Sequence, residues 1–132
     1  MTDAKRHPKG DLVIRTQTMP ADTNQNGDIF GGWLMSQMDL AGGILATEIA
    51  RGRIATVAVE GMTFHQPVKV GDVVCVYGDC TRIGNTSITI KLEVWIKPLL
   101  RSGSTERYCV TEALFTYVAI DDAGRPRPVP KD

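Results

Sequence analysis

The sequence predicts an α+β fold in which one curved antiparallel sheet wraps around a single long central helix. Residues 31–51 carry apolar side chains at helical spacing on nearly every side, so this helix needs cover from another element. The remaining regular segments have the composition of strands, and the later ones follow one another through short connections typical of antiparallel neighbours. Since only one sheet is available, the sheet must supply that cover.

The size and composition of the chain fit one such domain. It has 132 residues, of which 42% are hydrophobic, enough for a buried core. Fifteen basic residues balance fifteen acidic ones, so no nucleic-acid partner is indicated. Residues 1–10 do not form a signal peptide, and no apolar run approaches the roughly 20 residues of a membrane span. We therefore expect a cytoplasmic protein without a membrane partner.

The first elements lead into the helix. Residues 1–10 are expected to be disordered, and residues 11–18 are compatible with a strand that Pro20 ends, because proline has no N–H for the sheet. Residues 21–30 are rich in Asp, Asn, Thr and Gly and are typical of a structured loop. The helix follows over residues 31–51 and is roughly 30 Å long at 1.5 Å per residue.

Glycines mark two places in this helix. Gly42 and Gly43 each cost about 1 kcal/mol relative to alanine in a helix interior. Their presence indicates close approach of another backbone or of a ligand. Gly52 is expected to end the helix, with the Arg51 side chain near the negative end of its dipole.

Four long strands are expected after the helix. Residues 54–64 are rich in Val, Thr and Ala, residues 73–82 follow a turn, and residues 107–120 form the last strand. The single domain then spans residues 11–120, and residues 121–132 form an extended tail. The third strand has the clearest period of two, in which Ile88, Ile90, Leu92, Val94 and Ile96 alternate with Ser87, Thr89, Lys91, Glu93 and Trp95.

One carboxylate stands out in the apolar helix. Asp39 lies about two turns from the helix start, where it is costly unless something satisfies or uses it. Gly31 and Gly32 occupy the loop-to-helix junction, where a helix offers unpaired N–H donors and partial positive charge. Acyl transfer needs a general base close to hydrogen-bond donors that can stabilise an anion. The alternative is that Asp39 faces solvent or hydrogen-bonds a neighbouring strand.

Several motifs support a more specific hypothesis. The first is Asp22-Thr23-Asn24-x-x-Gly27-x-x-x-Gly31-Gly32-x-x-Met35-x-x-Met38-Asp39, and others follow at residues 57–64, 67–74, 93–95 and 111–115. Together they resemble the acyl-CoA thioesterases of the hotdog-fold superfamily, most closely the bacterial YciA type. The resemblance covers roughly residues 11–120.

This resemblance implies roles for three residues. Asp39 corresponds to the general base or nucleophile, and the backbone N–H of Gly32 corresponds to the donor that faces the thioester oxygen. Asn24 corresponds to the asparagine that lies across a subunit interface and orients water or the thioester, although an asparagine here can also be a simple turn former. The resemblance also implies a homodimer with joined sheets, often assembled into a trimer of dimers. The substrate that it implies is acyl-CoA, with short- to medium- or long-chain acyl groups.

Coenzyme A needs a binding surface for its arm and its phosphates. Gly31 and the segment Val59-Glu60-Gly61 are expected along the pantetheine arm, where glycine leaves room. Arg82 and Ser87 flank a turn that resembles the nucleotide-binding segment of related thioesterases. Three other residues are alternatives for the phosphates, namely Lys91, Arg107 and Arg125.

Other chemistries find less support. Neither His7 nor His65 has a partner at metal-ligand spacing, so we expect no metal and no cofactor. The three cysteines are expected to be reduced, and there is no Gly-x-Ser-x-Gly elbow for a catalytic serine. A hydro-lyase would need a histidine near Asp39, and neither histidine lies near the motif. A non-catalytic module that binds acyl-CoA or CoA remains the alternative function.

Overall fold

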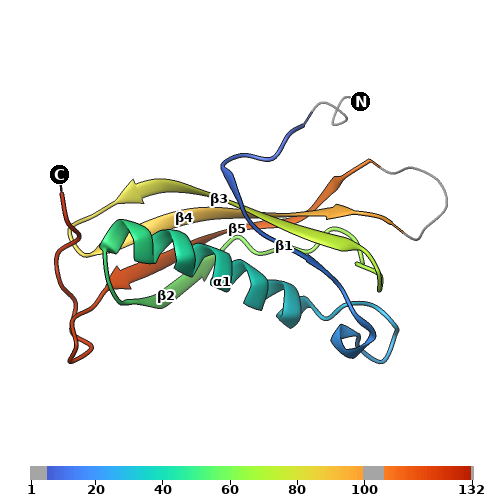
Figure 1. The fold of residues 1–132 in the computed structure, drawn as a ribbon, viewed down its shortest axis with the longest axis horizontal. Coiled ribbons are helices and arrows are strands. Elements are labelled where there is room, and N and C mark those ends of the chain that lie inside the picture. The colour runs from blue at the N-terminus through green and yellow to red at the C-terminus, as the bar shows by residue number, and fades with distance from the viewer. Residues whose placement is uncertain (1–5, 100–105, 132) are drawn as a thin grey trace.

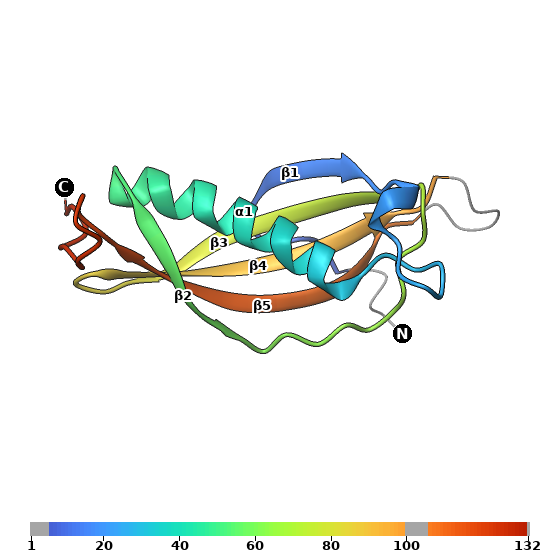
Figure 2. The ribbon, with the colours of Figure 1, turned by 90° about the horizontal axis from the view of Figure 1, so that it is seen from below.

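The structure is a computed structural model that describes residues 6–99 and 106–131. One long helix lies across one face of a curved antiparallel sheet, as predicted (Figures 1 and 2). The sheet order is β1-β3-β4-β5-β2, so β1 and β2 are its edges. The elements are β1 (Asp11–Gln17), the 3-10 turn η2 (Pro20–Asp22), α1 (Gly31–Ala50), β2 (Ile54–Glu60), β3 (Val73–Ile83), β4 (Ser87–Lys97) and β5 (Tyr108–Ala119).

The core lies between α1 and the inner face of the sheet. The predicted alternation in β4 is confirmed, because its five inward residues from Ile88 to Ile96 are all buried. Helix residues such as Met38 and Ala46 pack against them. The sheet covers only one side of the helix, however. Leu40 and Ile44 remain 58% and 47% exposed, which is unusual for adjacent large apolar side chains on one helix.

The end of α1 differs from the prediction. Arg51, not Gly52, adopts the left-handed conformation that ends the helix, with a φ of 55°. Arg127, from the C-terminal segment, donates from Nη2 to the carbonyl oxygen of Ala50 at 2.9 Å. A Cβ on Gly52 would lie 2.6 Å from that Nη2, so this glycine makes room for Arg127. The C-terminal segment therefore stabilises the helix end through a contact distant in sequence.

Strand β2 is shorter than predicted and is irregular. It ends at Glu60, because Gly61 turns the chain with a φ of 77°. It pairs with β5 only, and the register shifts between Thr56 and Ala58, which marks a β-bulge. A bulge redirects side chains locally and is common beside functional sites.

The N-terminal segment lies against the outer face of the sheet, opposite α1 (Figure 1). The Glu93 carboxylate on this face is 1% exposed and accepts a hydrogen bond from Trp95 Nε1 at 2.8 Å. Arg6 pairs with Glu112 at 3.0 Å and lies 5.5 Å from the centre of the Trp95 ring. Lys91 also pairs with Glu112, at 3.1 Å. Two cations thus neutralise two carboxylates. The prediction of disorder covers residues 1–10, and residues 1–5 of that segment lie outside the described residues.

Stability should depend on the ionisation of Glu112. Burial alone would raise the pKa of this carboxyl, but the hydrogen bonds from Lys91 and Arg6 outweigh burial and lower it. The stabilising contribution is therefore present above the unfolded pKa of about 4.3 and is lost as pH falls through the lower folded value. We expect the free energy of unfolding, measured with urea between about pH 6 and pH 3, to fall less steeply in Glu112→Gln. Equal slopes in the two proteins would contradict this assignment.

The described cysteines are all unpaired, as predicted. Burial raises the pKa of the Cys109 thiol to about 11, so this thiol stays protonated and unreactive near neutral pH. Among the described residues, no helix combines the length and apolar character needed to cross a membrane.

Candidate active site

The Asp39 carboxylate is held by two hydroxyl groups from neighbouring strands. Thr56 Oγ1 donates to Asp39 Oδ1 at 2.8 Å, and the Tyr117 hydroxyl donates to the same oxygen at 3.1 Å. Thr56 and Tyr117 are register partners on β2 and β5, so the strand pairing places both donors together. The bulge that follows Thr56 lies directly beside this contact. Asp39 is thus satisfied by the strands on one oxygen.

The second carboxylate oxygen of Asp39 is available. No residue within 6–99 or 106–131 donates a hydrogen bond to Oδ2. Asp39 is half-buried and lines a groove of about 470 Å³ between α1 and the start of β2. The other residues that line the groove are largely apolar: Leu40, Gly43, Ile44, Thr47, Glu48 and Ile54. A carboxylate with one fixed oxygen and one open oxygen can take a proton from water or attack a carbonyl.

Tyr117 acts as a hydrogen-bond donor in this site. Its side chain is fully buried, and burial raises the pKa of its hydroxyl. The negative charge of Asp39 raises this pKa further. The phenol is therefore neutral over the whole working range of an enzyme and keeps its proton toward the carboxylate.

The start of α1 has the free donors that the sequence predicts. Within the described part of the chain, neither Gly31 nor Gly32 donates its backbone N–H to an acceptor. A Cβ on Gly32 would meet nothing within 4 Å, so the space on the side-chain side of this residue is open. At Gly31 a Cβ would lie 3.3 Å from the Phe64 ring. The helix start can therefore accommodate an anion or a developing oxyanion.

Asn24 lies in a different groove from Asp39. This second groove, of about 330 Å³, is also lined by Gly31, Phe64 and His65. Asn24 Oδ1 accepts hydrogen bonds from the backbone N–H groups of Asn26 and Asp28, at 2.8 and 3.2 Å. In the described residues, nothing accepts a hydrogen bond from its side-chain amide nitrogen. Asn24 is thus a turn former whose amide donor is still available.

The residues predicted to bind coenzyme A fall in two places. Val59, Glu60 and Gly61 lie exposed at and just beyond the end of β2. Arg82 and Ser87 flank the β3–β4 hairpin, which lies beside the C-terminal end of α1 and far from Gly31 (Figure 2). A single chain therefore does not bring all of the predicted site residues together.

Two residues of this site were missed from the sequence. Thr56 and Tyr117 lie 17 and 78 residues from Asp39 along the chain. In the sequence, Thr56 is one of several strand residues in 54–64, and Tyr117 is one of the residues in the last predicted strand, 107–120. A hydroxyl on each of two predicted strands is a weak signal, because strand pairing and register decide whether it meets the helix.

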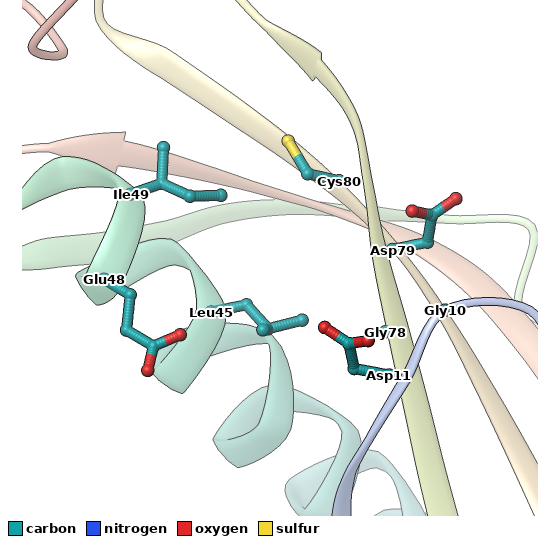
Figure 3. Close-up of a pocket in the computed structure, with 8 residues that line it drawn as sticks. All are labelled: Gly10, Asp11, Leu45, Glu48, Ile49, Gly78, Asp79 and Cys80. Atoms are coloured by element: carbon teal, nitrogen blue, oxygen red, sulfur yellow. The ribbon is translucent and has the colours of Figure 1, made fainter. Parts of the chain in front are cut away.

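A third groove lies on the other side of α1, toward β1 and β3 (Figure 3). Its lining includes three carboxylates, those of Asp11, Glu48 and Asp79, together with Cys80. Within the ranges that the structure describes, no group of His, Cys, Asp or Glu side chains is arranged to hold a metal ion. The negative charge of this groove disfavours the phosphates of a nucleotide ligand.

Comparison with known proteins identifies the family. Residues 26–101 match the thioesterase superfamily. Over 130 residues the chain is 62% identical to the acyl-CoA thioester hydrolase YciA of Salmonella typhimurium, covering 98% of each protein. The fold superposes with a TM-score of 0.92 on a hexameric broad-specificity acyl-coenzyme A thioesterase, which is 59% identical over 96% of this chain and 86% of that chain.

A more distant structure supports the same fold. A hexameric hotdog-fold thioesterase of Campylobacter jejuni is 39% identical and superposes with a TM-score of 0.86, over 92% of this chain and 91% of that chain. The resemblance noted in the sequence is confirmed. The chain therefore belongs to the thioesterase superfamily, as a hotdog-fold relative of the YciA acyl-CoA thioester hydrolases.

Proposed function

We propose that this enzyme hydrolyses acyl-CoA thioesters to the free acid and coenzyme A, and that it accepts short- to medium- or long-chain acyl groups. The observation that supports the proposal best is the Asp39 carboxylate, which is anchored through Oδ1 and open through Oδ2 at an apolar groove. An apolar wall suits an acyl chain, and an oriented carboxylate suits the hydrolytic step.

Asp39 serves as general base or as nucleophile in this proposal. As a base, it takes a proton from water while the water oxygen attacks the thioester carbonyl, after which the C–S bond breaks and coenzyme A leaves as a thiolate that takes up that proton. As a nucleophile, its oxygen attacks the carbonyl carbon, the C–S bond breaks, and coenzyme A leaves to give a mixed anhydride. Water then cleaves the anhydride, which releases the free acid and restores the carboxylate. In both routes negative charge develops on the carbonyl oxygen, and the backbone N–H of Gly32 stabilises it. One such donor typically contributes about 3–4 kcal/mol to the transition state.

The complete site needs a second copy of the chain. Asp39 lines one groove, while Asn24 and the helix start line another. The apolar residues Leu40, Ile44 and Val57 are exposed around the unpaired edge of β2. We propose a homodimer joined through the two β2 edges, which covers these residues and places Asn24 and Gly32 of one copy near Asp39 of the other. The two compared structures are of hexameric proteins, which supports a trimer of such dimers.

Coenzyme A is proposed to lie between copies as well. The pantetheine arm runs along Val59-Glu60-Gly61, and Gly31 allows close approach at the helix start. Arg82 and Ser87 hold the phosphates from the hairpin of the neighbouring copy, since the hairpin of the same chain lies at the other end of the helix. No cofactor takes part in this mechanism. The unpaired cysteines fit a reducing compartment, and we propose the cytoplasm.

The activity itself is tested by the release of free thiol from acyl-CoAs of increasing chain length. We expect saturable turnover with a broad range of acyl groups. The alternative function, a non-catalytic module for acyl-CoA or CoA, predicts binding in calorimetry without release of thiol from any substrate. That result would refute the proposed function.

Subunit exchange tests the shared site. Asn24→Asp retains the Oδ1 acceptor of the turn and replaces the amide donor by a charged carboxylate oxygen, and Asp39→Asn removes the carboxylate. Each protein alone should be nearly inactive. Equal amounts, dissociated and reassociated together, should regain about a quarter of wild-type activity, because half of the dimers then carry one intact site of two. Mixed dimers detected by mass spectrometry without any regained activity would contradict the arrangement.

A further inference from the structure

We propose that Tyr117 is a positioning residue for Asp39, and that Gly42 is present because the Tyr117 hydroxyl occupies the space of a side chain there. The inference rests on the proposed catalytic role of Asp39. It assigns a function to a buried polar group of β5 and explains the costly glycine inside α1.

Tyr117 is placed rigidly. Its side chain is 0% exposed, and its ring stacks on Phe115 with the centroids 6.3 Å apart. Its hydroxyl lies 3.1 Å from Asp39 Oδ1 and 3.3 Å from the backbone oxygen of Asp39. Thr56, the other donor, is an exposed residue on the edge strand. Of the two hydroxyls, that of Tyr117 is therefore fixed by core packing and can define the direction in which the carboxylate points.

Gly42 accommodates this contact. A Cβ at residue 42 would lie 2.2 Å from the Tyr117 hydroxyl oxygen and 2.9 Å from Leu92 Cδ1. The neighbouring Gly43 differs, because its Cβ would meet only Ile54 Cδ1 at 4.0 Å. Any side chain at residue 42 would push the phenol away from Asp39. The glycine and the tyrosine therefore form one unit that orients the carboxylate.

The hydrogen bond requires that Tyr117 keeps its proton. Burial raises the pKa of the phenol and the negative charge of Asp39 raises it further, so the hydroxyl stays protonated and donates to the carboxylate. Loss of the hydroxyl should leave the carboxylate less well directed at the substrate. That effect lowers turnover and leaves the binding of the acyl chain unchanged.

Tyr117→Phe tests the proposal by removing one oxygen atom and retaining the stacked ring. We expect kcat for acyl-CoA hydrolysis to fall about 10- to 100-fold with KM nearly unchanged, since the lost bond joins a neutral donor to a charged acceptor. Tyr77→Phe, on the outer face of the sheet, is the matched control and should leave kcat and KM unchanged.

Gly42→Ala supplies a second test. In the wild-type background it should lower kcat with KM nearly unchanged, a result that does not depend on the folding of Tyr117→Phe. In the Tyr117→Phe background its further effect on kcat should be much smaller, because the hydroxyl contact with Asp39 is already lost. Equal effects in the two backgrounds, or a wild-type kcat in Tyr117→Phe, would overturn the proposal.

A parallel assay of Asp39→Asn separates this inference from the function on which it rests. Wild-type turnover in Asp39→Asn would refute the catalytic role of Asp39. An inactive Asp39→Asn together with an unaffected Tyr117→Phe would leave that role intact and refute the positioning role alone.

Discussion

Asp39→Asn is expected to lower kcat for acyl-CoA hydrolysis by about 10²- to 10⁴-fold, the range that a positioned base or nucleophile contributes. The substitution removes the negative charge and one proton-accepting oxygen. It keeps a side chain of the same shape, whose remaining oxygen can still accept hydrogen bonds from Thr56 and Tyr117. The fold should therefore survive, and KM should change little, because in the proposed complex the acyl chain contacts the apolar groove rather than the carboxylate.

Steady-state release of thiol checks this expectation, with circular dichroism and the oligomer mass confirming that the variant is folded and assembled. Asp79→Asn makes the same chemical change on an exposed residue of β3 and should retain wild-type activity. A kcat in Asp39→Asn within a few-fold of the wild-type value would show that another group activates the nucleophile.

Val57→Asp is expected to separate the assembly into monomers and to lower kcat/KM by about 10²- to 10³-fold, the loss that follows removal of an oxyanion donor. Val57 is 57% exposed in the single chain, so the substitution does not disturb the core. In the proposed dimer, two aspartates would meet at the joined β2 edges and repel each other. Each separated chain would keep its Asp39 and lose the partner's Gly32 and Asn24.

The opposite edge of the sheet supplies the control for this prediction. Leu12 on β1 is 46% exposed, and Leu12→Asp introduces the same charge at another exposed edge residue. It should leave the dimer and its activity intact. Sedimentation analysis gives the mass, and circular dichroism tests folding. A fully active Val57→Asp monomer would show that one chain holds a complete site.

Local patterns were sufficient to predict most of the secondary structure. The alternation from Ile88 to Ile96 predicted both the strand and the face that packs on the helix, since a period of two leaves no other register for a half-buried strand. The long apolar run predicted the helix and its start at Gly31. The helix ends at Ala50, one residue before its predicted end, and Arg127, which is distant in sequence, donates a hydrogen bond to the carbonyl oxygen of Ala50.

The motif around Asp39 predicts a carboxylate in the helix and a donor-rich helix start, and the catalytic role of that carboxylate stays a prediction. The surroundings of that acid could not be predicted in the same way. The pairing of β2 with β5 places Thr56 and Tyr117 against Asp39. The need for glycine at residue 42 is explained only by the Tyr117 side chain that packs against it.

Residue type and spacing along this chain thus specify the elements, the acid and the family, because helix and strand periodicity and the turn residues act over a few neighbours. The folded chain specifies which oxygen of Asp39 is held, which is open, and that Asn24 lies in a separate groove. These features depend on register, on a bulge and on packing between segments far apart in sequence, and such long-range geometry leaves no periodic pattern in the residues themselves.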